Sequence, residues 1–186
     1  MRVERQHHGF SIVELIIVIT IIAVLASAVA FAMFDGPRRA RNAERLKAAD
    51  VYITLLSNFY TSKGYYPTRS GAVNYVCLGE GYPDFDGDTT RDCYDLTNAG
   101  PPYNTADEDA TFTTELKAYN NGRLPLNIKT PVVDRLGVSR VGPVLNYGGM
   151  EVIFFLEGDN EKCAVQKLVL AYSSNGTTYC YAQLEQ

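Results

Sequence analysis

Apolar and polar residues are distributed very unevenly along this chain. Residues 10–34 contain a single ionisable side chain, Glu14, and three hydroxyl side chains, so the segment has no polar face. At 1.5 Å per residue, a helix over this segment is roughly 37 Å long, which exceeds the roughly 30 Å core of a bilayer. We therefore expect a transmembrane helix over residues 10–35, followed by a break at Gly36 and Pro37.

Helical spacing continues beyond Pro37, but on one face only. Apolar side chains recur there at intervals of three or four residues, at Ala43, Leu46, Ala49, Ile53, Leu56 and Tyr60. If Pro37 only kinks the chain, one helix extends from Phe10 to Lys63. Its amphipathic second half is then available to cover a globular domain, which we place at residues 36–186.

The last third of the chain is rich in β-branched and aromatic residues. Three such runs are predicted as strands, at residues 152–156, 168–172 and 177–184. Asn175-Gly176 between the last two is typical of a β-hairpin. Residues 143–147 are a further candidate, at the edge of the sheet.

The segment between the long helix and these strands gives weaker signals. Residues 68–107 are rich in Gly, Pro, Asp and Asn and show no periodicity, which predicts a long loop. A short helix is expected from about Asp109 to Asn120. The predicted fold class is α+β, with a long N-terminal helix, transmembrane in its first half and amphipathic in its second, packed on a three- or four-stranded antiparallel sheet.

Composition argues against catalysis and against nucleic acid. The chain has two histidines, His7 and His8, and both precede the apolar segment. The remainder of the chain cannot form a Ser-His-Asp or Cys-His site or a zinc site with imidazole ligands, so we expect no enzyme. The net charge of -4 repels a polyanion.

The string from Gly9 to Ile16, Gly-Phe-Ser-Ile-Val-Glu-Leu-Ile, resembles the signal of type IV pilins and of the related pseudopilins of type II secretion. The resemblance implies a leader over residues 1–9, which a membrane prepilin peptidase cuts after Gly9. It also implies N-methylation of Phe10 and places Glu14 at the characteristic acidic position. Tyr65-Tyr66-Pro67, directly after the long helix, is similar to the pilin pattern as well.

Glu14 has a physical explanation within this resemblance. A carboxylate among lipid chains costs on the order of 2–3 kcal/mol unless it is paired. Cleavage after Gly9 creates an ammonium group on Phe10, and Glu14 of one copy can neutralise that of its neighbour in a bundle of helices. A shallow Glu14 that reaches the membrane surface is the other reading. We interpret Glu14 as an assembly residue.

An ordinary secretory signal is the alternative interpretation of the N-terminus. Arg2 and Arg5 then form its charged region, and cleavage follows the small residues at 26–28 or 28–30. The acid inside the apolar segment and the length of that segment both disfavour this reading.

Four cysteines in an exported domain predict two disulfides, for which three pairings are open. We favour Cys77–Cys93, which closes the long loop. The other pair, Cys163–Cys180, then ties down the final hairpin, as a C-terminal disulfide does in many pilins.

The long loop also carries a calcium-like spacing of acids. Five aspartates occupy the first, third, fifth, ninth and twelfth places of an EF-hand loop, namely Asp84, Asp86, Asp88, Asp92 and Asp95. Thr89 replaces the turn glycine at the sixth place, and the last acid is aspartate where a glutamate is usual. A solvated acidic loop and a calcium site are both open, and no other cofactor is expected.

Together these features predict a structural subunit that polymerises into a homo-oligomeric helical filament through its N-terminal helix. The precursor is expected in the inner or cytoplasmic membrane, with the peptidase and a membrane assembly platform as partners. The assembled protein is then an extracellular pilus or a periplasmic pseudopilus, in a major or a minor position. A membrane-anchored, calcium-dependent adhesion domain that never polymerises is the alternative.

Overall fold

The computed structural model describes residues 11–71, 74–85, 90–94, 106–125, 128, 130–165 and 169–185, and for residues 28, 30–35, 169 and 170 the backbone alone. The chain divides into two compact units, Met1–Ala40 and Arg41–Gln186. The predicted cleavage site, Gly9 and Phe10, lies outside the described residues.

Helix α1 spans Ile12–Lys63 and contributes to both units, which confirms the predicted long helix from Ile12 onward. Pro37 lies inside it, where its ring removes one backbone hydrogen bond, yet the helix continues on both sides. Among the described residues, none of the helices combines the length and the apolar character needed to cross a membrane. The predicted transmembrane segment over residues 10–35 is therefore not confirmed.

Helix α2, Ala110–Tyr119, forms where the periodicity predicted it. Asp109 is its N-cap, and its carboxylate Oδ1 accepts a hydrogen bond from the Phe112 amide at 2.9 Å. The Asn120 amide closes the other end on the Leu116 carbonyl at 3.0 Å. Phe112 and Leu116 are buried, as their spacing indicated.

The sheet is larger than predicted. The described residues form nine strands in one mixed sheet of order β4-β5-β2-β3-β1-β6-β7-β9-β8, and β1 pairs with β3 in parallel. The strands are β1 Tyr75–Cys77, β2 Asp92–Tyr94, β3 Ala106–Asp107, β4 Val132–Val133, β5 Ser139–Arg140, β6 Val144–Asn146, β7 Glu151–Glu157, β8 Val169–Ser174 and β9 Thr177–Gln183.

The prediction of three or four antiparallel strands was wrong because all five additional strands have only two or three residues. Strands β1, β2 and β3 belong to the segment predicted as loop, and runs so short cannot display a period of two. Strand β6 coincides with residues 143–147, which were predicted as an edge strand, but it lies inside the sheet, between β1 and β7. The predicted hairpin is present as β8 and β9, joined by Asn175 and Gly176 at φ of 54° and 83°.

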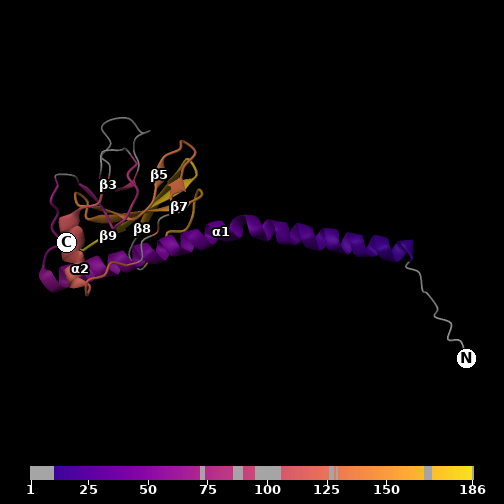
Figure 1. Ribbon diagram of the computed structural model, residues 1–186, viewed down its shortest axis with the longest axis horizontal. Helices are drawn as coiled ribbons and strands as arrows, with labels where there is room; N and C mark the ends of the chain where they lie inside the picture. The colour runs from indigo at the N-terminus through magenta and orange to yellow at the C-terminus, as the bar shows by residue number, and fades with distance from the viewer. Residues whose placement is uncertain are drawn as a thin grey trace, which may run out of the picture. The chain divides into compact units, whose positions relative to one another are not determined.

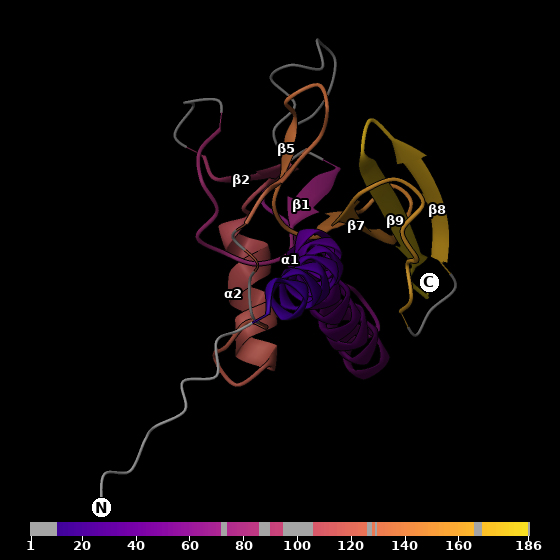
Figure 2. The same ribbon diagram turned by 90° about the vertical axis from the view of Figure 1, so that its right-hand side faces the viewer.

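The main core of the second unit lies between α1, α2 and one face of the sheet (Figure 1, Figure 2). Tyr52, Ile53, Leu56 and Phe59 of α1 are almost completely buried there. Alternate residues of β7, such as Phe154, face this core, while Phe155 belongs to a second cluster on the other face of the sheet. The amphipathic half of α1 therefore covers the sheet as predicted.

Candidate assembly site

Helix α1 begins with a pair of side chains that close its first turn. The Ser11 hydroxyl Oγ accepts a hydrogen bond from the Val13 amide at 3.3 Å, and Glu14 Oε2 accepts one from the Ser11 amide at 3.2 Å. Such reciprocal contacts, with serine before the helix and glutamate three residues later, form a capping box. Glu14, predicted as the assembly residue, therefore also has a partner within its own chain.

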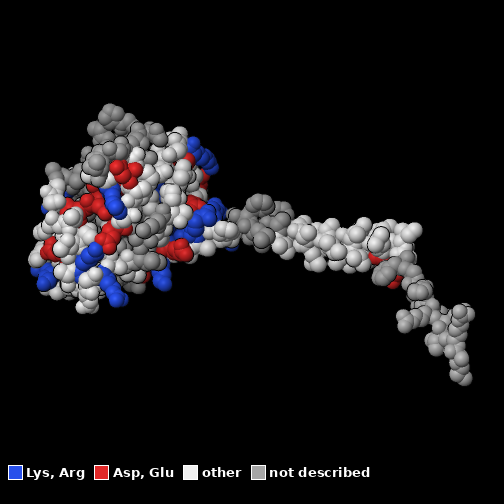
Figure 3. All heavy atoms as spheres, viewed as in Figure 1, with Lys and Arg blue, Asp and Glu red and all other residues white. Residues whose placement is uncertain are grey.

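The helix that follows has an apolar surface up to Val29, and Figure 3 shows the described part of this stretch as uncharged beyond its acidic start. Large aliphatic side chains are between 46% and 77% exposed on it, namely Ile12, Val13, Leu15, Ile16, Ile17, Val18, Ile19, Ile21, Ile22, Val24, Leu25 and Val29. The hydroxyls of Thr20 and Ser27 bond to the carbonyls of Ile17 and Val24 at 2.8 and 2.7 Å. Their polar groups are thus satisfied by the helix itself.

This surface has a substantial energetic consequence. Full burial of a large aliphatic side chain contributes about 1.5–3 kcal/mol, so burial of these half-exposed ones contributes on the order of 1 kcal/mol each. A helix that is apolar all round is stable only with an apolar neighbour, such as lipid or other helices. Burial of the described apolar surface by lipid or by other helices is therefore energetically favourable.

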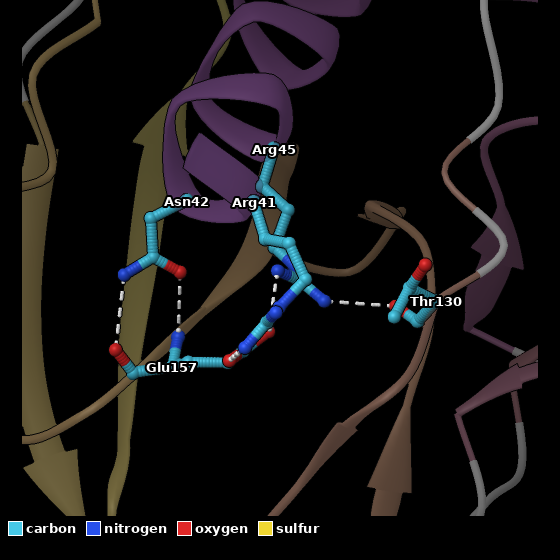
Figure 4. A network of polar contacts seen from close by, with 5 residues as sticks. All are labelled: Arg41, Asn42, Arg45, Thr130 and Glu157. Carbon is cyan, nitrogen blue, oxygen red and sulfur yellow. Dashed lines mark hydrogen bonds and ion pairs between the residues drawn. The ribbon is translucent and has the colours of Figure 1, made fainter. Parts of the chain in front are cut away.

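In the second unit, a polar network attaches the beginning of its part of α1 to the end of β7 (Figure 4). Glu157 accepts hydrogen bonds from Arg41 at 2.6 and 2.7 Å and from Arg45 at 2.9 Å. The Asn42 side chain donates to the Glu157 carbonyl and accepts from the Glu157 amide, both at 2.9 Å. Arg45 also donates to the Thr130 carbonyl at 2.8 Å.

Electrostatics within this network favour charged side chains. The hydrogen bond from Arg41 is the main reason that the pKa of Glu157 lies below its ordinary value, and Arg45 adds to the effect against the opposing effect of burial. Arg45 is 5% exposed, and burial lowers its pKa, which Glu157 partly offsets. A buried guanidinium is stable only with such a partner, so the network fixes this turn of α1 on the sheet.

Both favoured disulfides, Cys77–Cys93 and Cys163–Cys180, are present. The first joins β1 to β2 across the intervening strand β3, with 5.6 Å between the Cα atoms. The second ties the segment after β7 to β9, with 5.7 Å between the Cα atoms. Both therefore stabilise the second unit rather than an association surface.

The proposed calcium loop is only partly described. Asp86, Asp88 and Asp95 lie outside the described residues. Asp92 is buried, its Oδ2 accepts the Phe85 amide at 3.2 Å, and its own amide donates to the Pro83 carbonyl at 2.8 Å, while Asp84 is exposed. Within the described ranges no cluster of three or more His, Cys, Asp or Glu could hold a metal ion. Calcium binding stays a prediction.

Two groups of residues at these sites were not predicted. The capping role of Ser11 could have been predicted, because Ser-x-x-Glu before an apolar run is the sequence signature of a capping box. The network of Arg41, Arg45 and Glu157 had no such signal, since more than 100 residues separate its acid from its bases.

A family model matches the start of the chain. Residues 5–30 correspond to the prokaryotic N-terminal methylation motif. No curated protein and no solved structure matches this chain. This match supports the predicted signal at the start of the chain, which resembles that of type IV pilins and pseudopilins. The match ends within α1 and does not extend into the second unit.

Proposed function

We propose that this protein is a structural subunit of a type IV pilus or a related filament. A prepilin peptidase cuts it after Gly9, Phe10 becomes the methylated terminus, and the processed chain polymerises through α1. The observation that carries the proposal is the all-round exposed apolar surface of α1 behind a single acid, within the matched methylation motif.

The proposed mechanism is an exchange of apolar surroundings. Lipid surrounds the N-terminal helix before assembly, and helices of neighbouring copies replace the lipid in the filament. The Glu14 carboxylate of one copy then pairs with the Phe10 ammonium of another, so that two groups that are each costly in an apolar environment form one neutral site. The second unit remains folded throughout, held by its core and its two disulfides.

The partners in this proposal are further copies of the chain, the peptidase and a membrane assembly platform. The precursor resides in the inner or cytoplasmic membrane, and the product is an extracellular pilus or a periplasmic secretion pseudopilus. No catalytic role is proposed, because the chain has no histidine after His8 to serve as a base.

The intact mass of the protein from membranes and from sheared filaments tests the proposal. We expect a chain that begins at Phe10, carries one added methyl group and lacks the four hydrogens that two disulfides remove. A chain cleaved after residue 28 or 30, or an uncut monomer in native membranes, would contradict it.

A calcium-dependent adhesion domain that does not polymerise is the second candidate, and the spacing of the five aspartates from Asp84 to Asp95 favours it. An ion that binds only the folded state raises the unfolding temperature. If a chelator leaves the thermal unfolding of the low-micromolar chain unchanged, calcium is not a ligand and this candidate is excluded.

A further inference from the structure

The capping box at the start of α1 involves the residue to which the proposed function gives an intermolecular role. We infer that Ser11 is the positioning residue for Glu14, holding its carboxylate at the helix start ready for the amine of a neighbouring copy. The inference rests on the proposed function, since the amine exists only after cleavage at Gly9.

The two carboxylate oxygens of Glu14 differ in their hydrogen bonds. Glu14 uses Oε2 to accept the Ser11 amide at 3.2 Å. Among the described residues, no hydrogen bond to its Oε1 occurs, and a carboxylate has lone pairs for several donors. Glu14 can therefore keep its own helix capped and accept an ammonium proton from another chain at the same time.

Cleavage preserves this arrangement. All groups of the capping box belong to Ser11, Val13 and Glu14, which remain after the leader is removed. The new ammonium on Phe10 directly precedes Ser11, so it adds positive charge at the end of the helix where backbone amides already create a positive potential. A carboxylate in the first turn offsets that charge. A Glu14 side chain held at this position therefore stabilises the start of the helix more after cleavage than before it.

Ser11 restricts the conformations of the Glu14 side chain. A free glutamate side chain samples many rotamers, and pairing with a neighbour then costs conformational entropy. In the capping box, the Ser11 hydroxyl fixes the backbone at the helix start through the Val13 amide, and the Ser11 amide holds the carboxylate. Part of the ordering cost is thus met before assembly, which favours association.

Amide hydrogen exchange of the processed full-length chain in detergent micelles tests the contact itself. We expect Ser11→Ala to speed exchange at Val13 about fivefold, the usual effect of a lost cap. Glu14→Leu should speed exchange at Ser11 similarly, while Glu14→Gln preserves it because glutamine also forms a capping box. Unchanged exchange at Val13 in Ser11→Ala and at Ser11 in Glu14→Leu would overturn the inference.

Filament yield tests the consequence for assembly. We expect Ser11→Ala to lower the sheared-filament yield severalfold with unchanged processed protein in the membrane, and Ser11→Thr to restore the yield. Thr61→Ala is the matched control, because it removes an exposed hydroxyl bonded to the same helix at the Ser57 carbonyl, in the second unit, and its yield should equal wild type.

The outcomes separate the inference from the proposed function. Equal yields of Ser11→Ala and Thr61→Ala overturn the positioning role, and so does a fall in yield that only follows a fall in membrane protein. If the wild-type chain is processed but never forms filaments, the proposed function fails, and the intermolecular part of the inference fails with it. Amide exchange still decides in that case whether the capping box exists.

Discussion

The two halves of α1 belong to one continuous helix but have opposite surfaces. Up to Val29, the described aliphatic side chains are all about half exposed or more, and Glu14 is the single charged group. From Arg41 onward, one face is buried against the sheet, with Tyr52, Leu56 and Phe59 at 1% exposure or less. The second half therefore has its apolar partner within the second unit, whereas the described aliphatic side chains of the first half remain exposed.

The largest expected effect comes from removing a ring on the buried half. Phe59→Ala should lower the free energy of unfolding of the second unit by about 3–5 kcal/mol, because it leaves a cavity in the main core. Ile19→Ala, at a position 54% exposed on the first half, should change it by less than about 0.5 kcal/mol. Chemical denaturation of the full-length chain in micelles measures both, and equal effects would refute the contrast between the halves.

The second effect concerns the network that attaches the buried half to β7. Glu157→Gln leaves the guanidinium of Arg45 buried without its carboxylate, and we expect a loss of about 2–3 kcal/mol in the same denaturation experiment. Glu44→Gln is the control on the exposed side of the same helix and should lie within about 0.5 kcal/mol of wild type. A Glu157→Gln variant as stable as the control would show that the network does not fix α1.

The smallest effect is a dependence on pH. The pKa of Glu157 lies below its ordinary value of 4.5 in the folded chain, chiefly because of the hydrogen bond from Arg41. The pKa of Asp134 lies below 3.8, because bonds from the Val138 and Leu136 amides and from Arg140 outweigh the effect of burial. Both groups therefore stabilise the fold above these ordinary values, and this contribution is lost as pH falls through the folded pKa values.

We expect the free energy of unfolding to change little between pH 7 and about pH 5, and to fall by roughly 1 kcal/mol or more below pH 4. Denaturant titrations at a series of pH values measure this. Glu157→Gln should make the free energy of unfolding fall less steeply at acidic pH. An unchanged slope would mean that other carboxylates cause the fall. The first unit contains only Glu4, Glu14 and Asp35 of the 21 acidic residues, so the second unit should account for most of the slope.

Long, periodic elements were predictable because each position repeats the same signal. The helix through Lys63, α2 between Asp109 and Asn120, and the hairpin at Asn175 and Gly176 all follow from local pattern and capping chemistry. The short strands did not, because two or three residues become a strand only when a neighbour supplies the hydrogen bonds. Strand β3 illustrates this, since Asp107 pairs with both β1 and β2 while Ala106 pairs with β2.

The candidate site divides in the same way. Glu14 could be identified from its apolar surroundings, and its cap could have been read from Ser11 three residues earlier. Glu157 could not be connected with Arg41 and Arg45, because nothing local to β7 indicates which helix lies beside it. Contacts of that kind depend on the register in which α1 packs on the sheet.

The order of residues alone indicates an apolar helix with one acid, a methylation motif that overlaps its start, and an α+β unit after it. Helical periodicity, solvation cost and capping act between near neighbours, so they can be read from the order of residues. The order of the nine strands that the described residues form, the burial of Arg45 and its pairing with Glu157 follow from the packing of distant segments. These depend on which distant segments exclude water from one another, and that choice is made by the packing of the whole unit.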